Sequence, residues 1–345
     1  MNPHFPKLEF VSLLDLYTLY LYRQIENRDH NFAVMADLIL LDNVERNPNT
    51  VLTVGTFDGV HAGHRAILDT VVRKSQERGA RSVLVTFDPH PRNIINPGEA
   101  GIKLLTTIQE RSEILNELGI DQTVVIPFDR DFSLLSSEEF IRDIIYNKIG
   151  VSEFVIGYDH HFGRNREGTI ETVEVLGREL GFEAYVVSKK EVGEQTVSST
   201  AIRKALSEEG DVRKAAEFLQ RPYRLNGTVI HGEKRGKEIG FPTANIKPEH
   251  PQKVIPKDGV YAVRVRVMDN WFKGMMNIGT RPTFDESIRT LEVNLFDFEE
   301  NIYGKEVQVR FFEHLRDEVK FDGINGLIQQ LQQDEKQARQ LLDDH

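Results

Sequence analysis

The sequence predicts two domains: a doubly wound α/β domain built on a parallel sheet, followed by an antiparallel β-barrel closed by an α-helix. From residue 51 to about residue 207, short β-rich runs alternate with stretches of helical periodicity. Such strand–helix repeats force the strands to pair in parallel through right-handed crossovers. Beyond Arg221-Pro222 the β-rich runs follow one another across short turns, which is typical of an antiparallel sheet or a small barrel. The length of 345 residues allows each domain a core of its own.

The expected elements of the α/β domain have start and stop signals. Thr107 with Glu110, and Ser136 with Glu139, have the spacing of a capping box at a helix start. Four glycines follow helical stretches, at positions where a left-handed residue ends a helix. Residues 35–41 are a candidate first strand. The glycines are Gly79, Gly119, Gly150 and Gly181, and the later β-rich runs are residues 51–54, 82–87, 122–126, 153–156 and 183–187.

The expected elements of the barrel domain are strands joined by tight turns, with one helix at the end. Met268-Asp269-Asn270 predicts a hairpin turn. Residues 323–342 carry apolar residues at helical spacing and predict an amphipathic closing helix. We therefore expect domains at residues 35–220 and 221–345. The β-rich runs of the second domain are residues 229–231, 260–267, 271–277, 291–296 and 307–312.

Residues 1–34 precede the first expected strand and form an N-terminal extension of doubtful status. The apolar and aromatic stretch at residues 10–22 is interrupted by Asp15 and has no basic segment before it, so we do not expect a secretory signal. An upstream start codon is one explanation of the extension. A peptide from residues 5–30, detected by mass spectrometry of the native protein, would rule that explanation out.

The composition limits the classes of function. A net charge of −11 argues against a nucleic-acid or membrane-surface partner, because phosphate backbones need a basic face. The chain has no cysteine, which excludes disulfides and thiolate metal sites and fits a cytoplasmic location. It has no uninterrupted apolar run of about 18 residues, so no membrane span is expected. Any phosphate chemistry must therefore use a few local cations or a metal ion.

Five unusual polar segments each follow one of the expected strands of the α/β domain. The carboxyl ends of parallel strands meet at one edge of a sheet, and open α/β sheets bind their ligands at that edge. The clustering of these segments therefore predicts a site there. The segments are residues 55–64, 88–92, 128–131, 157–166 and 197–203.

The first of these segments, Gly55-Thr-Phe-Asp-Gly-Val-His-Ala-Gly-His64, is suited to phosphate chemistry. A strand that enters a helix through a glycine-rich turn offers backbone N–H groups and the helix dipole to an anion. His61 and His64 are three residues apart, so their rings can point to the same side, and Gly63 lets a ligand approach the backbone. Further hydroxyl groups and cations come from Ser198, Ser199, Thr200, Arg203, Arg164 and Arg166.

Each of these features has an ordinary structural explanation when it is taken alone. The histidines could be solvated side chains at a helix start, Ser-Ser-Thr could be an N-cap, and the arginines could be surface charges. Taken together, they supply what a triphosphate needs in an otherwise acidic protein.

Two sets of motifs carry a family resemblance. The segments at residues 55–64, 86–92, 157–168 and 198–203 resemble the adenylyltransferase half of the bacterial bifunctional riboflavin kinase/FAD synthetases, whose first motif is the HxGH signature of nucleotidyltransferases. The second half is similar to the kinase module of the same family. Its motifs are residues 231–236, 239–246, 277–283, 291–297 and 315–321, and the match covers residues 49–340 in family order.

Some positions depart from the family pattern. Thr56 stands where Asn is frequent, and His160-His161 where an aromatic residue and Arg are usual. The change at His161 puts one basic contact of the adenylyltransferase site in doubt. Lys237 replaces a frequent Arg and keeps its charge without the planar fork. Asn294 replaces a frequent His.

The resemblance implies two consecutive reactions: riboflavin and ATP give FMN, and FMN and ATP then give FAD and pyrophosphate. In the adenylyltransferase half it implies His61 and His64 as catalytic residues. Asp159 could instead fix its own loop. The residues implied to bind ATP or pyrophosphate are Gly55, Phe57, Gly63, Ser198, Ser199, Thr200 and Arg203, and those implied to position nucleotide or flavin are Asp58, Asp159, Arg164 and Arg166.

In the kinase half the resemblance implies Glu292 as the base that activates a neutral ribityl hydroxyl. Periodicity alone would make Glu292 an ordinary outward-facing strand residue, and Phe321 could equally belong to the core. Thr243 and Asn245 are implied to hold Mg²⁺. The residues implied to bind ATP are Gly236, Lys237, Gly240, Pro242, Thr243 and Asn245, and those implied to bind flavin are Arg316 and Phe321.

Two other functions compete with this interpretation. Another HxGH enzyme, such as a cytidylyl-, pantetheine-phosphate or nicotinamide-mononucleotide adenylyltransferase, would share the first motif but would not explain the antiparallel half. A flavin-binding regulator that has lost catalysis would be expected to have lost reactive residues as well. The residues that remain intact are His61, His64, Ser199, Arg203, Thr243, Asn245 and Glu292.

Overall fold

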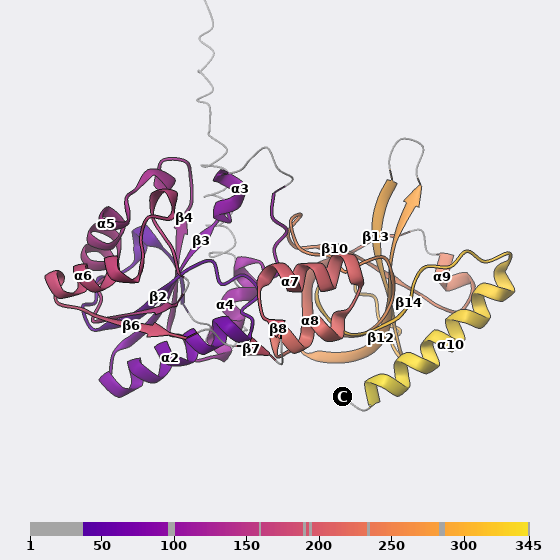
Figure 1. Cartoon of the computed structure of the whole chain (residues 1–345). Helices are drawn as coiled ribbons and strands as arrows, with labels where there is room; N and C mark the ends of the chain where they lie inside the picture. The colour runs from indigo at the N-terminus through magenta and orange to yellow at the C-terminus, as the bar shows by residue number, and fades with distance from the viewer. Residues whose placement is uncertain are drawn as a thin grey trace, which may run out of the picture.

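A computed structural model describes most of the chain from residue 37 onward. The described residues are 37–95, 101–158, 160–188, 191–192, 195–232, 235–282 and 287–343. The expected extension at residues 1–34 and the candidate Asp159 lie outside them. Figure 1 shows the sheet-based domain on one side, the barrel on the other, and two helices, α7 and α8, between them.

The first domain is built on a six-stranded parallel sheet, as predicted. The strand order is β1-β4-β3-β2-β5-β6, so the chain winds outward from β2 in one direction and then returns to its other side. The candidate first strand is confirmed as β1. The strands are β1 Asp37–Leu40, β2 Thr50–Val54, β3 Arg81–Asp88, β4 Gln122–Pro127, β5 Glu153–Gly157 and β6 Glu183–Val187.

Helices cover both faces of this sheet. Apolar side chains of α2 (Ala62–Arg78) and α4 (Ile108–Glu117) share one core cluster with the strands. Those of α6 (Ile170–Leu180) and a π-helical segment, η3 (Phe140–Ile149), share a second cluster with the alternate strand residues. The order of the strands reverses between β2 and β5, which makes this pair the topological switch point where open sheets bind ligands. The shorter elements are η1 Leu41–Asn43, α3 Pro91–Ile95, η2 Phe132–Leu134, α5 Ser137–Glu139, η4 Arg164–Arg166, β7 Glu191–Val192 and β8 Gln195–Thr196.

The predicted helix signals are present, with one difference. Both capping boxes form, at Thr107 and at Ser136. Gly79 and Gly181 end their helices in the left-handed conformation. Gly150 has φ 84° with an extended ψ of 141°, so it is not a left-handed cap. A Cβ atom at Gly150 would lie 2.4 Å from the carbonyl oxygen of Asn47, so close packing also requires a glycine there.

The second domain is a closed antiparallel barrel, as predicted. Its strand order is β10-β13-β12-β11-β14-β9, and β9 pairs with β10 to close it. The predicted hairpin turn joins β11 to β12, where Val267 pairs with Asn270 and Met268 has φ 51°. The β-rich runs did not include β10. The strands are β9 Tyr223–Ile230, β10 Ala244–Pro248, β11 Gly259–Val267, β12 Asn270–Pro282, β13 Ser287–Leu295 and β14 Glu306–Arg316.

The remaining helices pack on the barrel. The helices α7 (Ser199–Lys204) and α8 (Val212–Leu219), with η5 (Ala205–Glu209) between them, share one core cluster with the barrel interior. The predicted closing helix is α10 (Ile324–Asp343), which covers part of the outer barrel face (Figure 1). A short helix, α9 (Arg235–Glu238), precedes β10. None of the helices in the described ranges is long and apolar enough to cross a membrane.

Candidate functional sites

The loop at residues 55–64 leaves β2 at the switch point and has an unusual backbone. Phe57 has φ 44°, Gly59 has φ 87° and Val60 has φ 42°. A positive φ is rare for a β-branched residue and costs free energy unless its surroundings hold it. The next residue, His61, is extended and is the N-cap of α2. The loop therefore delivers both histidines at the start of a helix.

The two imidazole rings are stacked. Their centroids are 3.6 Å apart with an interplanar angle of 16°. His61 Nδ1 accepts a hydrogen bond from the backbone N–H of His64 at 3.3 Å. A neutral ring that accepts at Nδ1 carries its proton on Nε2, so His61 has an N–H group to donate elsewhere. The ring of Phe57 lies 4.8 Å from that of His64 and supports it on another side.

Both histidines are uncharged near neutral pH. Burial lowers the pKa of His61 to about 4, although the carboxylate of Asp58 opposes that shift. Burial lowers the pKa of His64 well below its usual value, and the neighbouring His61 and the cations Arg111 and Arg221 add to that shift. The buried Nδ1 of His64 has no hydrogen-bond partner among the described residues. Polar ring atoms beside buried cations are suited to an anionic ligand.

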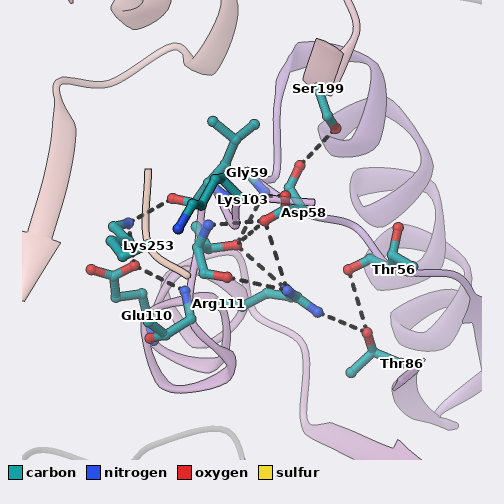
Figure 2. Close-up of polar contacts among 12 residues, drawn as sticks. Thr56, Asp58, Gly59, Thr86, Lys103, Glu110, Arg111, Ser199 and Lys253 are labelled. Atoms are coloured by element: carbon teal, nitrogen blue, oxygen red, sulfur yellow. Dashed lines mark hydrogen bonds and ion pairs between the residues drawn. The ribbon is translucent and has the colours of Figure 1, made fainter. Parts of the chain in front are cut away.

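The side chain of Asp58 is buried under the loop and joins several segments (Figure 2). Its carboxylate accepts hydrogen bonds from the backbone N–H groups of Leu105 (3.1 Å) and Thr106 (2.9 Å). It also pairs with Arg203 and lies 3.8 Å from Arg111. Burial opposes ionisation, but the two arginines and the two N–H groups outweigh it and lower the pKa of Asp58. In this structure Asp58 anchors the loop.

The start of α7 lies against the same loop. Ser198 caps the helix by accepting from the N–H of Ala201 at 3.2 Å. Ser199 Oγ donates to the carbonyl oxygen of Asp58 at 2.9 Å (Figure 2). Arg203 Nε donates to the carbonyl oxygen of Lys103 at 2.6 Å, while its terminal nitrogen pairs with Asp58. The predicted Ser/Thr/Arg cluster and the histidine loop therefore meet, through contacts between Asp58 and α7, and Thr200 remains exposed.

The other predicted segments approach the loop to different extents. The ring of His160 lies 3.9 Å from the place that a Cβ of Gly55 would occupy, and 5.7 Å from the ring of Phe162. Arg164 and Arg166 are exposed in η4, and their side chains form no hydrogen bond or ion pair within the described ranges. These two guanidinium groups therefore remain available to a ligand.

Glu292 occupies the centre of a second site, in the barrel domain. It lies on β13 directly opposite Asn245 of β10 and Asn277 of β12. Leu291 and Val293 on either side belong to the barrel interior, so Glu292 is on the outer face, as periodicity predicts. The helix α10 covers this part of the outer face, and a cavity of about 280 Å³ lies between the helix and the strands.

The cavity brings together several of the predicted kinase residues. Thr243 Oγ1 lies 3.3 Å from Glu292 Oε2, within hydrogen-bond distance. Arg316 makes a bidentate ion pair with Asp334 of α10, at 2.8 to 3.1 Å, and lies over the ring of Phe321. The predicted residues that line the cavity are Gly236, Thr243, Glu292, Arg316 and Phe321.

The other predicted kinase residues lie beside the cavity. The carbonyl oxygen of Pro242 accepts from Asn294 Nδ2 at 2.7 Å, and Asn294 lines the cavity. The side chain of Asn245 packs against Gly232. Gly240 follows α9 with φ 85°. The structure describes the backbone of Lys237 within α9 but not its side chain.

Sequence reasoning missed residues in both sites. Asn277 stands in a motif quoted for the resemblance, and its register opposite Glu292 gives it a place in the cavity. Arg111 is fully buried on α4 and hydrogen-bonds to Thr86 at 3.0 Å and to Thr106 at 3.4 Å (Figure 2). A single arginine within a stretch of helical periodicity is a weak sign of a functional residue in the sequence.

Comparisons with known proteins match both halves of the chain. A family model for FAD synthetase matches residues 43–201, and one for riboflavin kinase matches residues 219–342. A Listeria monocytogenes protein named bifunctional riboflavin kinase/FMN adenylyltransferase is 38% identical over 294 residues, which are 84% of this chain and 92% of that protein. The chain belongs to this bifunctional family.

Other members of the family and one solved structure agree with this assignment. A Bacillus subtilis protein of the same name is 35% identical, over 85% of this chain and 93% of that protein. A crystal structure from Streptococcus pneumoniae, described as a macrolide-efflux protein, is 30% identical with a TM-score of 0.80 and covers 88% of this chain and 98% of that one. The two-domain fold is therefore shared along nearly the whole length of that structure.

Proposed function

We propose that this chain catalyses two consecutive steps of flavin cofactor synthesis: it phosphorylates riboflavin with ATP to FMN, and then adenylylates FMN with ATP to FAD and pyrophosphate. The observation that carries the proposal is that one chain holds two separate sites of different chemistry. A stacked imidazole pair lies at the switch point of the sheet, and a cavity containing a carboxylate lies outside the barrel. The histidine loop and residues 198–200 fall within the FAD synthetase match at residues 43–201, and the cavity at Glu292 falls within the riboflavin kinase match at residues 219–342.

Adenylyl transfer needs no general base at the first site. The nucleophile is the phosphate of FMN, which is anionic near neutral pH, so catalysis consists of alignment and charge stabilisation. His61 and His64 are uncharged, stacked and carried at the start of α2, where an α-phosphate would also meet the helix dipole. Their ring N–H groups donate to the oxygens of the α-phosphorus as charge grows on them.

The remaining residues of this site bind the departing pyrophosphate and position the substrates. Ser198 and Thr200 at the start of α7 and Arg203 in its last turn would hold the departing pyrophosphate, and Ser199 fixes that helix to the loop. Gly55, Phe57 and Gly63 shape the surface that ATP approaches. Exposed Arg164 and Arg166 position nucleotide or flavin, while Asp58 acts by holding the loop.

Riboflavin phosphorylation needs a base, because its nucleophile is a neutral hydroxyl. Glu292 serves as that base on a strand held from both sides, and the Thr243 hydroxyl beside it fixes its carboxylate. Thr243, directly before β10, and Asn245 within it are two positions apart and offer side-chain oxygen ligands, which suits Mg²⁺. When bound there, Mg²⁺ supplies positive charge to the ATP phosphates. Gly236, Lys237, Gly240 and Pro242 bind ATP, and Phe321 and Arg316 contact the flavin.

One incubation tests the proposal. The purified chain is given riboflavin, ATP and Mg²⁺, and the products are separated by chromatography. Both FMN and FAD should appear, with FMN first. FMN alone would remove the adenylyltransferase assignment, and the absence of both would remove the proposal. The lack of cysteine and the use of ATP favour a cytoplasmic site for these reactions.

A further inference from the structure

Side chains from outside the histidine loop cap consecutive carbonyl groups within it. Ser199 donates to the carbonyl oxygen of Asp58 at 2.9 Å. Arg221 donates to the next two carbonyl oxygens, from Nη2 to Gly59 at 2.6 Å and from Nη1 to Val60 at 3.0 Å. Arg221 Nη1 also donates to the carbonyl oxygen of Leu219 at 2.9 Å, which fixes the guanidinium to the end of α8.

Arg221 reaches the loop from the barrel side of the chain. It lies in the turn between α8 and β9, 161 positions after Val60. It stands within the riboflavin kinase match that begins at residue 219 and outside the FAD synthetase match that ends at residue 201. Sequence comparison of the adenylyltransferase half alone would therefore not associate Arg221 with the histidine loop.

The conformation of the loop explains why such a clamp is needed. Val60, with φ 42°, directly precedes His61. A β-branched residue in this conformation is held only if its surroundings fix it. Val60 is fully buried, and Arg221 bonds both its carbonyl group and that of Gly59. Relaxation of Val60 would turn His61 and the first N–H groups of α2.

Arg221 is a buried cation whose described hydrogen bonds are made to carbonyl groups of the loop and of the end of α8. Burial lowers the pKa of Arg221 to about 9, and the nearby cations Arg224 and Arg65 add to the shift. Arg221 forms no ion pair with a carboxylate within the described ranges, and the partners seen there for its guanidinium are the three backbone carbonyl groups. A buried cation whose described partners are carbonyl groups indicates a need for the planar fork of the guanidinium group, which a Lys side chain lacks.

We infer that Arg221 is a positioning residue for adenylyl transfer: it clamps the Gly59 and Val60 carbonyl groups and thereby sets the orientation of His61 and of the start of α2. This inference rests on the proposed adenylyltransferase activity. It makes the FAD-forming site depend on a residue of the kinase half, whereas Arg221 is not among the described residues that line the cavity at Glu292.

The test uses the full chain and both of its activities. In Arg221→Ala, kcat for FAD formation from FMN should fall about 10- to 100-fold, the scale of a misplacement of about 1 Å in an active site. KM for ATP and for FMN should stay within about threefold, because the groups that bind them remain. Riboflavin phosphorylation by the same preparation should be unchanged. Arg221→Lys should be impaired nearly as much, and added guanidinium should partly restore Arg221→Ala.

Arg213→Ala is the matched control, because Arg213 is an exposed arginine of α8 that pairs with Glu313 on the surface. It should leave both activities unchanged. A normal kcat for FAD formation in Arg221→Ala would overturn the inference, as would a parallel loss of both activities in Arg221→Ala and Arg221→Lys. If Arg221→Ala does not fold, a normal kcat in folded Arg221→Lys overturns it and a selective loss of FAD formation supports it. A wild-type chain that forms no FAD would instead refute the proposed function.

Discussion

Lys253 of the barrel domain and Glu110 of α4 form an ion pair that is buried between the two domains (Figure 2). Lys253 Nζ lies 2.5 Å from Glu110 Oε2 and also donates to the carbonyl oxygen of Leu105 at 2.6 Å. The carboxylate accepts further bonds at 3.0 Å from the N–H groups of Thr107 and of Asn226 in β9. This ion pair and the further hydrogen bonds of its two side chains thus join the barrel to the segment whose N–H groups, at Leu105 and Thr106, bond to Asp58.

Replacing Lys253 by Met should destabilise the chain by about 3 to 5 kcal/mol, because Glu110 would keep a buried charge without its partner. The free energy of unfolding, measured by urea denaturation, checks this value. Lys257→Met is the matched control, since Lys257 and its partner Asp317 are exposed and such pairs contribute at most about 1 kcal/mol. A loss below about 1 kcal/mol in Lys253→Met would contradict the expected role of the pair.

Much of the fold could be predicted from the sequence, because local patterns determine it. The alternation of strands and helices predicted the parallel sheet, and the spacing of Thr107 and Glu110 predicted a capping box that forms. The strand β10 could not be predicted in this way. Residues 242–245, which include the first two residues of β10, resemble a turn, and β10 becomes a strand by pairing with β9 and β13 on either side.

The candidate sites depend on contacts that no local pattern contains. The sequence indicated that His61 and His64 share one side, and the rings do stack. The partners of Asp58 lie 47 to 145 positions away, so its place under the loop could not be inferred from its motif. Likewise, periodicity placed Glu292 on the outer face of its strand, but only the packing of α10 turns that face into a cavity.

Glu292→Gln should abolish FMN formation from riboflavin and leave FAD formation from FMN near the wild-type rate. The amide keeps the size of the side chain and its position beside Thr243, but it cannot take the proton from a ribityl hydroxyl. Separate assays with riboflavin and with FMN measure the two steps. Glu299→Gln, a change at an exposed residue of the same domain, should affect neither step.

Retention of riboflavin phosphorylation by Glu292→Gln would remove Glu292 as the base. Loss of both activities would show that the two sites do not act independently.

His64→Ala should lower kcat for FAD formation by about 10²-fold or more, the usual scale for the loss of one donor to a transition state. The change removes one ring of the stacked pair and leaves the backbone N–H group of residue 64, which donates a hydrogen bond to His61 Nδ1. Riboflavin phosphorylation in the same sample is the control for folding. Full FAD formation by His64→Ala would exclude His64 from the mechanism.

Acid should destabilise the chain partly through His61. Burial lowers the pKa of His61 from its ordinary value of 6.5 to about 4, so between these pH values the unfolded state binds a proton that the folded state does not. Stability should therefore fall as the pH is lowered through this window, with about 2 kcal/mol lost between pH 7 and pH 5 from this one group. His61→Asn keeps an acceptor at the N-cap of α2 but cannot titrate there. The difference in free energy of unfolding between pH 7 and pH 5 should be smaller in His61→Asn by about that amount, and an equal loss in both proteins would show that His61 is not held neutral.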